Sequence, residues 1–266
     1  MKKVGIIFAM EEELNELLTY LNIKNEYDIF DLKFYEGTIY DIECVLVKCG
    51  VGKVNAARTT QILIDNIKVD YIFNIGVAGG ISDILKVGDI VIAESLVQHD
   101  FDITAFDHEK GYIPEIGVYI KTDEYLYTVA NNVLRNESEQ NIVSGVIASG
   151  DIFCTELSMG QKINKKFNAL CVEMEGASIA QICHLCHIPF LVLRSISDTP
   201  NNNNVITYEK FLETSSKNIA NAMSKILNKL NIIGIPTTIY NNRSFENHST
   251  QSNTSRALLR FAYFFK

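Results

Sequence analysis

The sequence predicts an α/β protein: a single three-layer α/β/α domain with a mixed, mostly parallel central sheet. Three observations lead to this prediction. Short apolar runs rich in β-branched residues alternate with segments of helical periodicity along most of the chain. Two adjacent strand-like runs, 33–39 and 42–49, are separated only by Tyr40 and Asp41, which predicts an antiparallel hairpin and hence a mixed sheet. The chain shows neither an internal repeat nor an interior linker, which favours one domain.

Each element is predicted from its own pattern. The apolar runs predict strands at 3–9, 33–39, 42–49, 69–76, 88–94, 144–149 and 189–196. Apolar residues at helical spacing predict helices at 11–22, 53–67, 122–135, 156–167, 174–187 and 207–230. The pattern ends near residue 230, and 241–255 is polar and without period. We therefore expect a folded domain over 1–230 and a loose or disordered tail over 231–266.

Composition narrows the class of protein. A net charge of -8 argues against a nucleic-acid partner, which would favour a basic stripe. No run approaches the roughly 20 apolar residues of a membrane helix, so no membrane partner is expected. The first apolar run, about seven residues, is too short for a signal peptide. We therefore expect a cytoplasmic protein whose six cysteines are reduced thiols.

Two acidic motifs stand far apart in the chain but in equivalent places. The run 4–10 ends in Glu11, Glu12 and Glu13, and the run 189–193 leads to Asp198. Each reads as a buried strand that delivers an acid at its carboxyl end, where open α/β sheets bind ligands. Two such acids can act as general base and general acid. The alternatives are ordinary ones: acids that complement a helix dipole, and an aspartate that caps a turn.

Two further segments lie between the acids. Gly76-Val77-Ala78-Gly79-Gly80 follows a predicted strand, where glycines let the backbone approach a ligand; it lacks the pattern of a phosphate-binding loop. Val172-Glu173-Met174-Glu175-Gly176 precedes a predicted helix. A carboxylate there could accept two ribose hydroxyls, with Met174 packed against the sugar; the alternative is a helix start enriched in acids. Together with the two acidic motifs, these segments point to a hydrolase acting on a nucleoside.

The segment Cys183-His184-Leu185-Cys186-His187 matches the pattern of haem attachment and faintly resembles a metal site. Haem attachment requires export, and zinc would require a second ligand pair at a comparable spacing. The small residues at Ala177, Ala180 and Cys183 have the spacing of a buried helical stripe. We expect a structural helix end, and neither a metal nor a cofactor.

The segments, taken in order, resemble the 5′-methylthioadenosine/S-adenosylhomocysteine nucleosidases, within the nucleoside phosphorylase-like family. The resemblance covers about residues 2–230. It is carried by the segments 6–13, 50–54, 76–80, 98–106, 149–151, 172–177 and 194–198.

This resemblance implies hydrolysis of the bond between adenine and ribose C1′, without a cofactor and in a homodimer. It makes Asp198 the general acid at adenine N7 and Glu13 the general base for water. Glu175 would hold the ribose hydroxyls, with Met174 beneath the sugar. We expect the pKa of Asp198 to be raised by an apolar pocket, and Glu13 to stay ionised in more polar surroundings.

The resemblance also implies the walls of the pocket. Phe153 would stack on adenine while the backbone of Cys154 meets its polar edge, and Ser197 and Arg194 would orient the Asp198 side. Gly79 belongs to the glycine-rich segment of the pocket. An apolar wall for the 5′-alkylthio group is expected from Met10, Val51 and Phe106. Tyr208 and Ile103 complete this wall, one of them contributed by a partner subunit.

The chain departs from the family pattern at two positions. Phe8 stands where a small residue is common, and Val77 where some members have serine. Neither departure removes a carboxylate.

Three alternatives remain beside the nucleosidase, which could also act on 5′-deoxyadenosine or 6-amino-6-deoxyfutalosine. A nucleoside phosphorylase would need cations or a nest of amides for phosphate, yet three of only six arginines lie in the tail, at 243, 256 and 260. A non-catalytic nucleoside-binding protein would not need Glu13, Glu175 and Asp198 together. A haem or metal protein is the most distant alternative.

Overall fold

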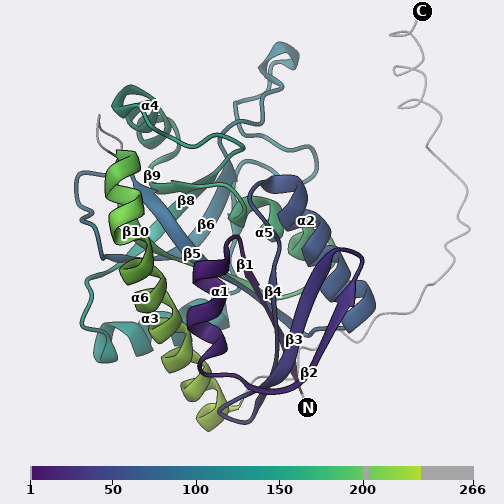
Figure 1. Cartoon of the computed structure of the whole chain (residues 1–266). Helices are drawn as coiled ribbons and strands as arrows, with labels where there is room; N and C mark the ends of the chain where they lie inside the picture. The colour runs from purple at the N-terminus through teal and green to yellow at the C-terminus, as the bar shows by residue number, and fades with distance from the viewer. Residues whose placement is uncertain (1, 200–203, 235–266) are drawn as a thin grey trace, which may run out of the picture. The chain divides into compact units, whose positions relative to one another are not determined.

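The computed structural model describes residues 2–199 and 204–234 of the chain. The strands are β1 (Lys3–Phe8), β2 (Asn22–Ile29), β3 (Leu32–Ile39), β4 (Ile42–Lys48), β5 (Tyr71–Gly80), β6 (Ile90–Gln98), β7 (Ile120–Lys121), β8 (Ile142–Ser149), β9 (Ala169–Glu173) and β10 (Phe190–Asp198). The helices are α1 (Glu11–Leu18), α2 (Lys53–Ile62), α3 (Glu124–Glu137), α4 (Leu157–Phe167), α5 (Gly176–Leu185) and α6 (Asn204–Ile233) (Figure 1). A π-helical turn, η1 (Leu63–Ile67), extends α2, and a 3₁₀ turn, η2 (Thr104–Phe106), follows β6.

The sheet is mixed, as the sequence predicts. β10, β5, β1 and β4 are parallel neighbours in that order, so their carboxyl ends meet at one edge. β3 and β4 form the predicted hairpin. Tyr40 and Asp41 at its tip both have positive φ, 47° and 63°, as a type I′ turn requires.

The sheet also closes on itself, which the sequence does not predict. β5 pairs with β10 on one side and with β9 on the other, and the path β10-β6-β8-β9-β5 returns to its start. Five strands therefore form a closed ring, and β1, β4, β3 and β2 extend it as an open sheet. The closure brings the carboxyl ends of β8 and β9 to the same place as those of β5 and β10.

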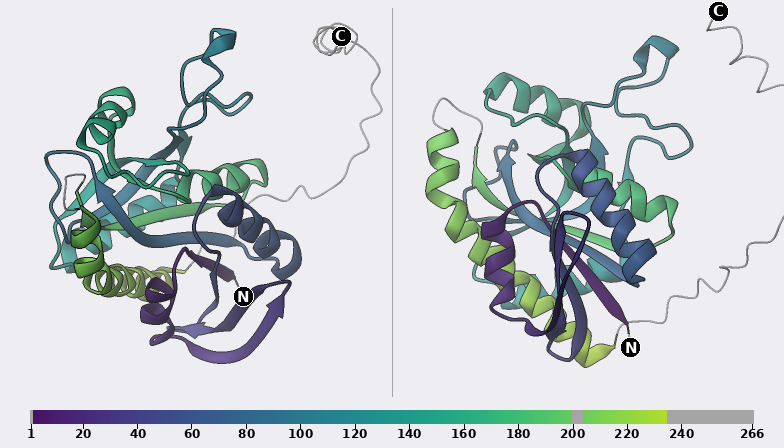
Figure 2. Two further views of the ribbon diagram at one scale, coloured as in Figure 1. Left: turned by 45° about the horizontal axis from the view of Figure 1, so that its top comes forward. Right: turned by 45° about the vertical axis from the view of Figure 1, so that its right-hand side comes forward.

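Helices cover both faces of the sheet, which confirms the predicted layers. Apolar side chains of α1, α3 and α6 pack on one face in a cluster with residues of β1 and β5, including Phe8 and Phe73. The other face carries α2 and α5, whose buried small residues Ala56, Ala177 and Ala180 let the helices approach closely. Figure 2 shows this arrangement, with the purple α1 and the yellow-green α6 on one side of the strands and the blue α2 on the other.

Three strands, β2, β7 and β9, are not predicted by the sequence, and several boundaries differ; β7 has only two residues. β2 is an edge strand with the polar sequence NIKNEYDI, whose stability comes from its ladder with β3 rather than from an apolar run. It begins at Asn22, so the helix predicted over 11–22 ends early, at Leu18. β9 is short and was read as the lead-in to a helix. The long strands β5 and β6 continue past the predicted ends because ring closure supplies further partners.

The predicted domain end at 230 falls within α6, which continues to Ile233. The described residues form one compact unit. Most of the predicted tail, from residue 235, lies outside the described residues, and its looseness stays a prediction. Within the described residues, none of the helices combines the length and apolar content needed to cross a membrane.

Candidate active site

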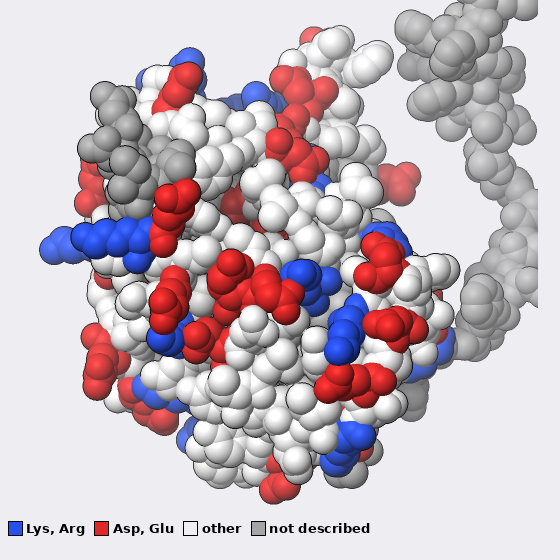
Figure 3. All heavy atoms as spheres, in the orientation of Figure 1, with Lys and Arg blue, Asp and Glu red and all other residues white. Residues whose placement is uncertain are grey.

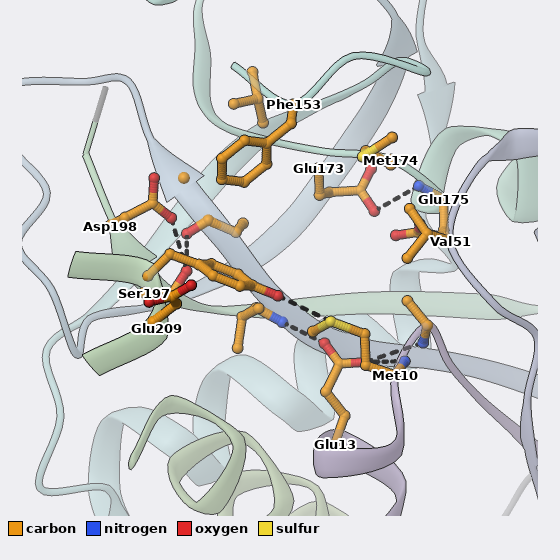
Figure 4. A pocket seen from close by; sticks show the side chains of 16 residues that line it. Met10, Glu13, Val51, Phe153, Glu173, Met174, Glu175, Ser197, Asp198 and Glu209 are labelled. Carbon is orange, nitrogen blue, oxygen red and sulfur yellow. Dashed lines mark hydrogen bonds between the residues drawn. The ribbon is translucent and has the colours of Figure 1, made fainter. Parts of the chain in front are cut away.

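A cavity of about 530 Å³ opens at the carboxyl ends of β1, β5, β9 and β10. Its size suits a nucleoside-sized ligand. Figure 4 shows carboxylates entering it from strands and from helix starts, with Asp198 and Glu13 on opposite sides. It is lined by Ala9, Met10, Glu13, Val51, Val77, Ala78, Gly79, Phe153, Val172, Glu173, Met174, Glu175, Ser197, Asp198, Tyr208 and Glu209.

Glu13 is the one acid of the first motif that turns inward. Glu11 and Glu12 are exposed, whereas Glu13 is buried. Its Oε2 accepts hydrogen bonds from the amides of Ala9 and Met10, each at 3.0 Å, and its Oε1 accepts one from the amide of Val77 at 3.0 Å. The bond to Met10 closes the first turn of α1 like half of a capping box, so the same carboxylate caps the helix and lines the cavity.

Arg194 lies behind the cavity wall as the central cation. It is almost fully buried and forms an ion pair with Glu173, while its Nη2 also donates to Asn74 Oδ1 at 2.5 Å. Glu175 Oε2 is 4.0 Å from the same guanidinium. Glu173 is held further by Ser149 Oγ and by the amide of Gly176 at 2.7 Å, the first residue of α5. Glu173 therefore joins the arginine to a helix N-terminus.

Glu175 is buried and reaches the cavity from the start of α5. Its Oε1 accepts a hydrogen bond from the amide of Gly52 at 2.8 Å. Because the other oxygen touches only the edge of the Arg194 guanidinium, this carboxylate keeps lone pairs available for a ligand.

Burial raises the pKa of both cavity glutamates. For Glu13 desolvation is the largest effect, opposed by the Arg194 charge and by its three amide donors. For Glu175 desolvation and the neighbouring Glu173 charge raise the pKa to about 8, although Arg194 and the Gly52 amide act against this. The amide donors provide the polar surroundings expected for Glu13, but desolvation outweighs them.

Asp198 occupies the other side of the cavity, at the end of β10. It is buried, and Ser197 Oγ donates to its Oδ1 at 2.8 Å. A Cβ on Gly79 would lie 3.4 Å from Asp198 Oδ2, so the glycine leaves room beside the carboxylate. Ser197 thus orients Asp198, as expected.

Aromatic and sulfur-containing side chains form the outer wall. The rings of Phe153 and Tyr208 meet edge to face at 5.6 Å, and Tyr208 Oη lies 2.9 Å from Met10 Sδ. Cys154 lines a smaller pocket that shares Phe153 and Asp198 with the main cavity. Phe153 is 44 % exposed, which leaves its ring free to stack on a ligand.

The structure brings most of the predicted site residues together. Those that line the main cavity are Met10, Glu13, Val51, Gly79, Phe153, Met174, Glu175, Ser197, Asp198 and Tyr208. Arg194 acts from behind the wall. Phe106 and Ile103 are not brought there: Phe106 is 68 % exposed, on an excursion after β6 that leads away from the sheet (Figure 1). Phe106 and Ile103 do not line the cavity of one chain, and their place in the 5′ wall stays a prediction.

Sequence reasoning missed two contributors. The sequence motif gives Glu173 no separate role, and it does not indicate that the amide of Gly52 contributes to the site. A signal existed for Glu173, because two acids two residues apart before a helix cannot both be explained by one sugar. The amide of Gly52 leaves no signal in the sequence, since every residue except proline has one.

The six cysteines all lie among the described residues, and none of them forms a disulfide. Cys183 is buried beside Ala180 against the sheet and Cys186 follows the end of α5, so the Cys-His segment is a helix end. The described residues contain no group of three or more side chains able to hold a metal ion.

Comparison with known proteins agrees with this geometry. The family described as Phosphorylase superfamily matches residues 3–228. A 5′-methylthioadenosine/S-adenosylhomocysteine nucleosidase of Geobacillus is 37% identical over 229 residues, which are 86% of this chain and 99% of that protein. The nucleosidase of Desulfotalea psychrophila is 42% identical over 230 residues, 86% of this chain and 98% of that protein.

Solved structures give the same result. A mutant Helicobacter pylori nucleosidase with 5′-methylthioadenosine in the active site has a TM-score of 0.83 and 34% identity, covering 86% of this chain and all of the other. A futalosine hydrolase mutant from the same organism has a TM-score of 0.83 and 35% identity, covering 86% of this chain and 100% of the other.

The chain therefore belongs to the phosphorylase superfamily, a class in which the fold alone does not fix the attacking group. Within that superfamily its family is the 5′-methylthioadenosine/S-adenosylhomocysteine nucleosidases, which are N-glycosyl hydrolases. The nucleosidase predicted from the sequence is confirmed, and neither the phosphorylase nor the non-catalytic alternative is favoured.

Proposed function

We propose that this chain hydrolyses the adenine–ribose bond of 5′-methylthioadenosine and S-adenosylhomocysteine, with Asp198 as general acid and Glu13 as general base. The observation that carries the proposal is the pair of buried carboxylates facing one cavity from opposite sides (Figure 4). A glycosidic bond needs an acid at the leaving group and a base at the water, separated by the sugar.

The reaction follows from these positions. Asp198 gives its proton to adenine N7, and the electron pair of the C1′–N bond moves into the base as that bond breaks. The ribose becomes oxocarbenium-like, and a water attacks C1′ while Glu13 takes its proton. The products are adenine and the thioribose. Glu175 accepts the two ribose hydroxyls, and Met174 packs beneath the ring.

The raised pKa of Glu13 supports its role as base. A carboxylate at its ordinary pKa is a weak base at neutral pH, and desolvation brings it closer to the proton it must accept. Its three amide donors and Arg194 still keep the ionised form accessible. Water held near this carboxylate is therefore a better nucleophile than bulk water.

The charges at the cavity favour water over phosphate. Among the described residues that line it, five are acidic and none is lysine or arginine. Arg194 is occupied by Glu173 behind the wall, and acidic side chains also gather over the start of α1 (Figure 3). A phosphate dianion would meet repulsion from these charges, whereas water would not.

A homodimer would explain how Ile103 and Phe106 can form part of a pocket wall. The excursion that carries them projects from the body of the protein, and Phe106 is 68 % exposed (Figure 2). In a homodimer they would complete the 5′ wall of the partner's pocket, beside Met10 and Val51. The 5′-alkylthio group would then be enclosed by both subunits.

The substrate range extends to other 5′-modified adenosines. The cavity has an open side at Val51, which is 49 % exposed, so a larger 5′ group can leave it. Because a futalosine hydrolase has the same fold with 35% identity, 6-amino-6-deoxyfutalosine and 5′-deoxyadenosine are the further candidates. A cytoplasmic location remains a prediction.

The test is adenine release from 5′-methylthioadenosine in phosphate-free buffer by the wild type, Asp198→Asn and Glu13→Gln. We expect rapid release by the wild type and losses of about 10²–10⁴-fold in each variant. Release that required added phosphate would establish phosphorolysis. If the wild type released nothing but its melting temperature rose with the nucleoside, the non-catalytic binding protein would replace the proposal.

A further inference from the structure

The N-terminus of α2 is capped by a residue almost a hundred positions further along the chain. Its N-cap is Gly52, with a φ of 103° and no side chain to accept an amide. The amide of the first helical residue, Lys53, donates instead to Asp151 Oδ1 at 2.8 Å, from the loop after β8. A Cβ on Gly52 would lie 3.2 Å from that oxygen, so glycine serves both the φ and the close approach.

Asp100 completes a closed cycle of contacts with these two residues. Its Oδ1 accepts from Lys53 Nζ at 2.7 Å, and its Oδ2 accepts from the amide of Asp151 at 3.0 Å. The side chains of Lys53 and Asp100 are each only 18% exposed, so this ion pair is partly shielded from solvent. We call Lys53, Asp100 and Asp151 the loop clamp; it joins the first residue of α2 to the loops after β6 and β8.

The loop clamp ends next to the cavity. The amide of Lys53 points to Asp151, and the preceding amide, that of Gly52, points to Glu175 Oε1 at 2.8 Å. Two consecutive amides are thus divided between a clamp carboxylate and a cavity carboxylate. The two amides belong to neighbouring peptide planes joined at the Cα of Gly52, so a hydrogen bond that fixes one plane limits the other to the orientations that φ and ψ of Gly52 allow. Val51, which lines the cavity, precedes both.

We propose that Asp151 is a positioning residue for the nucleosidase reaction: by holding the Lys53 amide it aims the Gly52 amide at Glu175, and so keeps that carboxylate oriented and ionised for the ribose hydroxyls. The role assigned to Glu175 rests on the proposed function. Asp151 itself is not among the residues that line the cavity.

The charges around Glu175 make its pKa sensitive to the hydrogen bond from the Gly52 amide. Glu173 and Glu13 raise its pKa together with burial, and only Arg194 and the Gly52 amide lower it. The Cys49 thiol and the Tyr208 hydroxyl also face Glu175, and its charge helps to raise the pKa of each. Loss of the Gly52 bond would therefore raise the pKa of Glu175 above about 8 and reduce its ionised fraction at neutral pH.

The experiment compares Asp151→Ala and Asp151→Asn with Asp123→Ala. Asp123 caps α3 in the same way, with Oδ1 accepting from Leu126 N at 2.9 Å, but no residue of α3 lines the cavity. For 5′-methylthioadenosine we expect Asp151→Ala to raise KM about tenfold at pH 7.5 and kcat to change less than threefold. The rise of 1/KM with pH should move to higher pH by about one pH unit. Asp151→Asn keeps an acceptor and should restore most of the wild-type behaviour, whereas Asp123→Ala should change only stability.

A second readout does not depend on turnover. In protein labelled with ¹³C at glutamate side chains, the Glu175 carboxyl resonance, assigned from Glu175→Gln, should titrate at higher pH in Asp151→Ala than in the wild type. Lys53→Met breaks the clamp from the other side and should shift this titration in the same direction, which keeps the test open if Asp151→Ala does not fold.

The outcomes separate the two proposals. An unchanged Glu175 titration in the clamp variants, or equal effects of Asp151→Ala and Asp123→Ala on KM, would overturn the positioning role. Absence of adenine release by the wild type would overturn the proposed function, while the titration would still decide whether the clamp controls Glu175.

Discussion

The two sides of the cavity handle acidic side chains in different ways. On the side of Glu13, three glutamates surround one buried cation, Arg194, and the backbone supplies amides to each of them. On the side of Asp198, that carboxylate is bonded to Ser197 and stands beside Phe153 and Val172, and Glu209 lines the cavity near Ser197 (Figure 4). The acids of the first side are grouped around a buried cation, whereas no lysine or arginine is among the described residues that line the cavity.

This difference shows how one residue class can perform opposite tasks. A cation and amide donors favour the ionised form, but burial outweighs them at Glu13 and Glu175 and raises the pKa of both carboxyls, which makes each a stronger base. An acid among apolar groups retains its proton more readily, as a donor to a leaving group requires. The roles proposed for Glu13 and Asp198 rest on these different surroundings and on the sides of the cavity from which the two acids enter.

The largest expected effect comes from changing the leaving group, which sharpens the comparison directly. The probe is a 5-methylthioribosyl glycoside of p-nitrophenol, whose leaving group departs as a stable anion without protonation. In Asp198→Asn the rate of hydrolysis should fall about 10³-fold with 5′-methylthioadenosine but less than tenfold with this probe. In Glu13→Gln the rate of hydrolysis should fall about 10²-fold with both substrates, because water must be activated in either case. Nitrophenolate absorbance and adenine release measure the two rates.

One outcome would contradict the proposed role of Asp198. If Asp198→Asn were equally impaired on both substrates, Asp198 would not act at the leaving group, and the two sides would share one function. Wild-type rates on both compounds, measured in the same phosphate-free buffer, are the reference.

A pair of glycines offers the next test, one glycine on each side. A Cβ on Gly76 would lie 2.5 Å from Glu13 Oε1, so Gly76→Ala must displace the base. A Cβ on Gly79 would meet Asp198 Oδ2 at 3.4 Å, an ordinary contact. We expect kcat to fall about 10²-fold in Gly76→Ala and less than fivefold in Gly79→Ala. Equal losses in kcat, with both proteins folded by circular dichroism, would contradict the assignment of the tighter geometry to the Glu13 side.

The same contrast explains what the sequence could predict. Glu13 and Asp198 follow long apolar strands, so their place at the sheet edge could be read from residue order, and the three layers follow from helices alternating with strands. Ring closure could not be predicted, because the pairing of β5 with β9 involves only Gly79 with Val172 and Gly80 with Cys171. The polar edge strand β2 lacks any apolar run.

Interactions made by the backbone were equally hidden. Glu175 depends on the amide of Gly52, and Lys53 on a carboxylate about a hundred residues away, so local patterns contain no trace of either contact. Phe106 is a different case: a family resemblance places it in the wall, and the fold of one chain leaves it exposed, so its role there stays a prediction.

The last expected effect is on stability, and it tests the cost of gathering acids on one side. Burial and Glu173 raise the pKa of Glu175 from 4.5 to about 8 in the folded protein. Between these values the folded state binds more protons at this site than the unfolded state, so the free energy of unfolding falls as pH rises through this window. Below pH 4.5 the site is protonated in both states and this loss is absent.

Glu175→Gln removes the titration while its amide oxygen can still accept from Gly52. A shift from 4.5 to about 8 corresponds to roughly 5 kcal/mol, so at pH 9 the variant should be more stable than the wild type by up to that amount, whereas at pH 5 the difference should be about 1 kcal/mol or less. Urea unfolding at pH 5, 7 and 9 measures it, with Asp123→Asn as a control in which a helix cap outside the cavity is neutralised. A stability difference between Glu175→Gln and wild type that did not grow with pH would mean that Arg194 fully compensates the third glutamate. In that case the charge on the Glu13 side would carry no energetic cost, and the cavity would gain its hydroxyl acceptor without loss of stability.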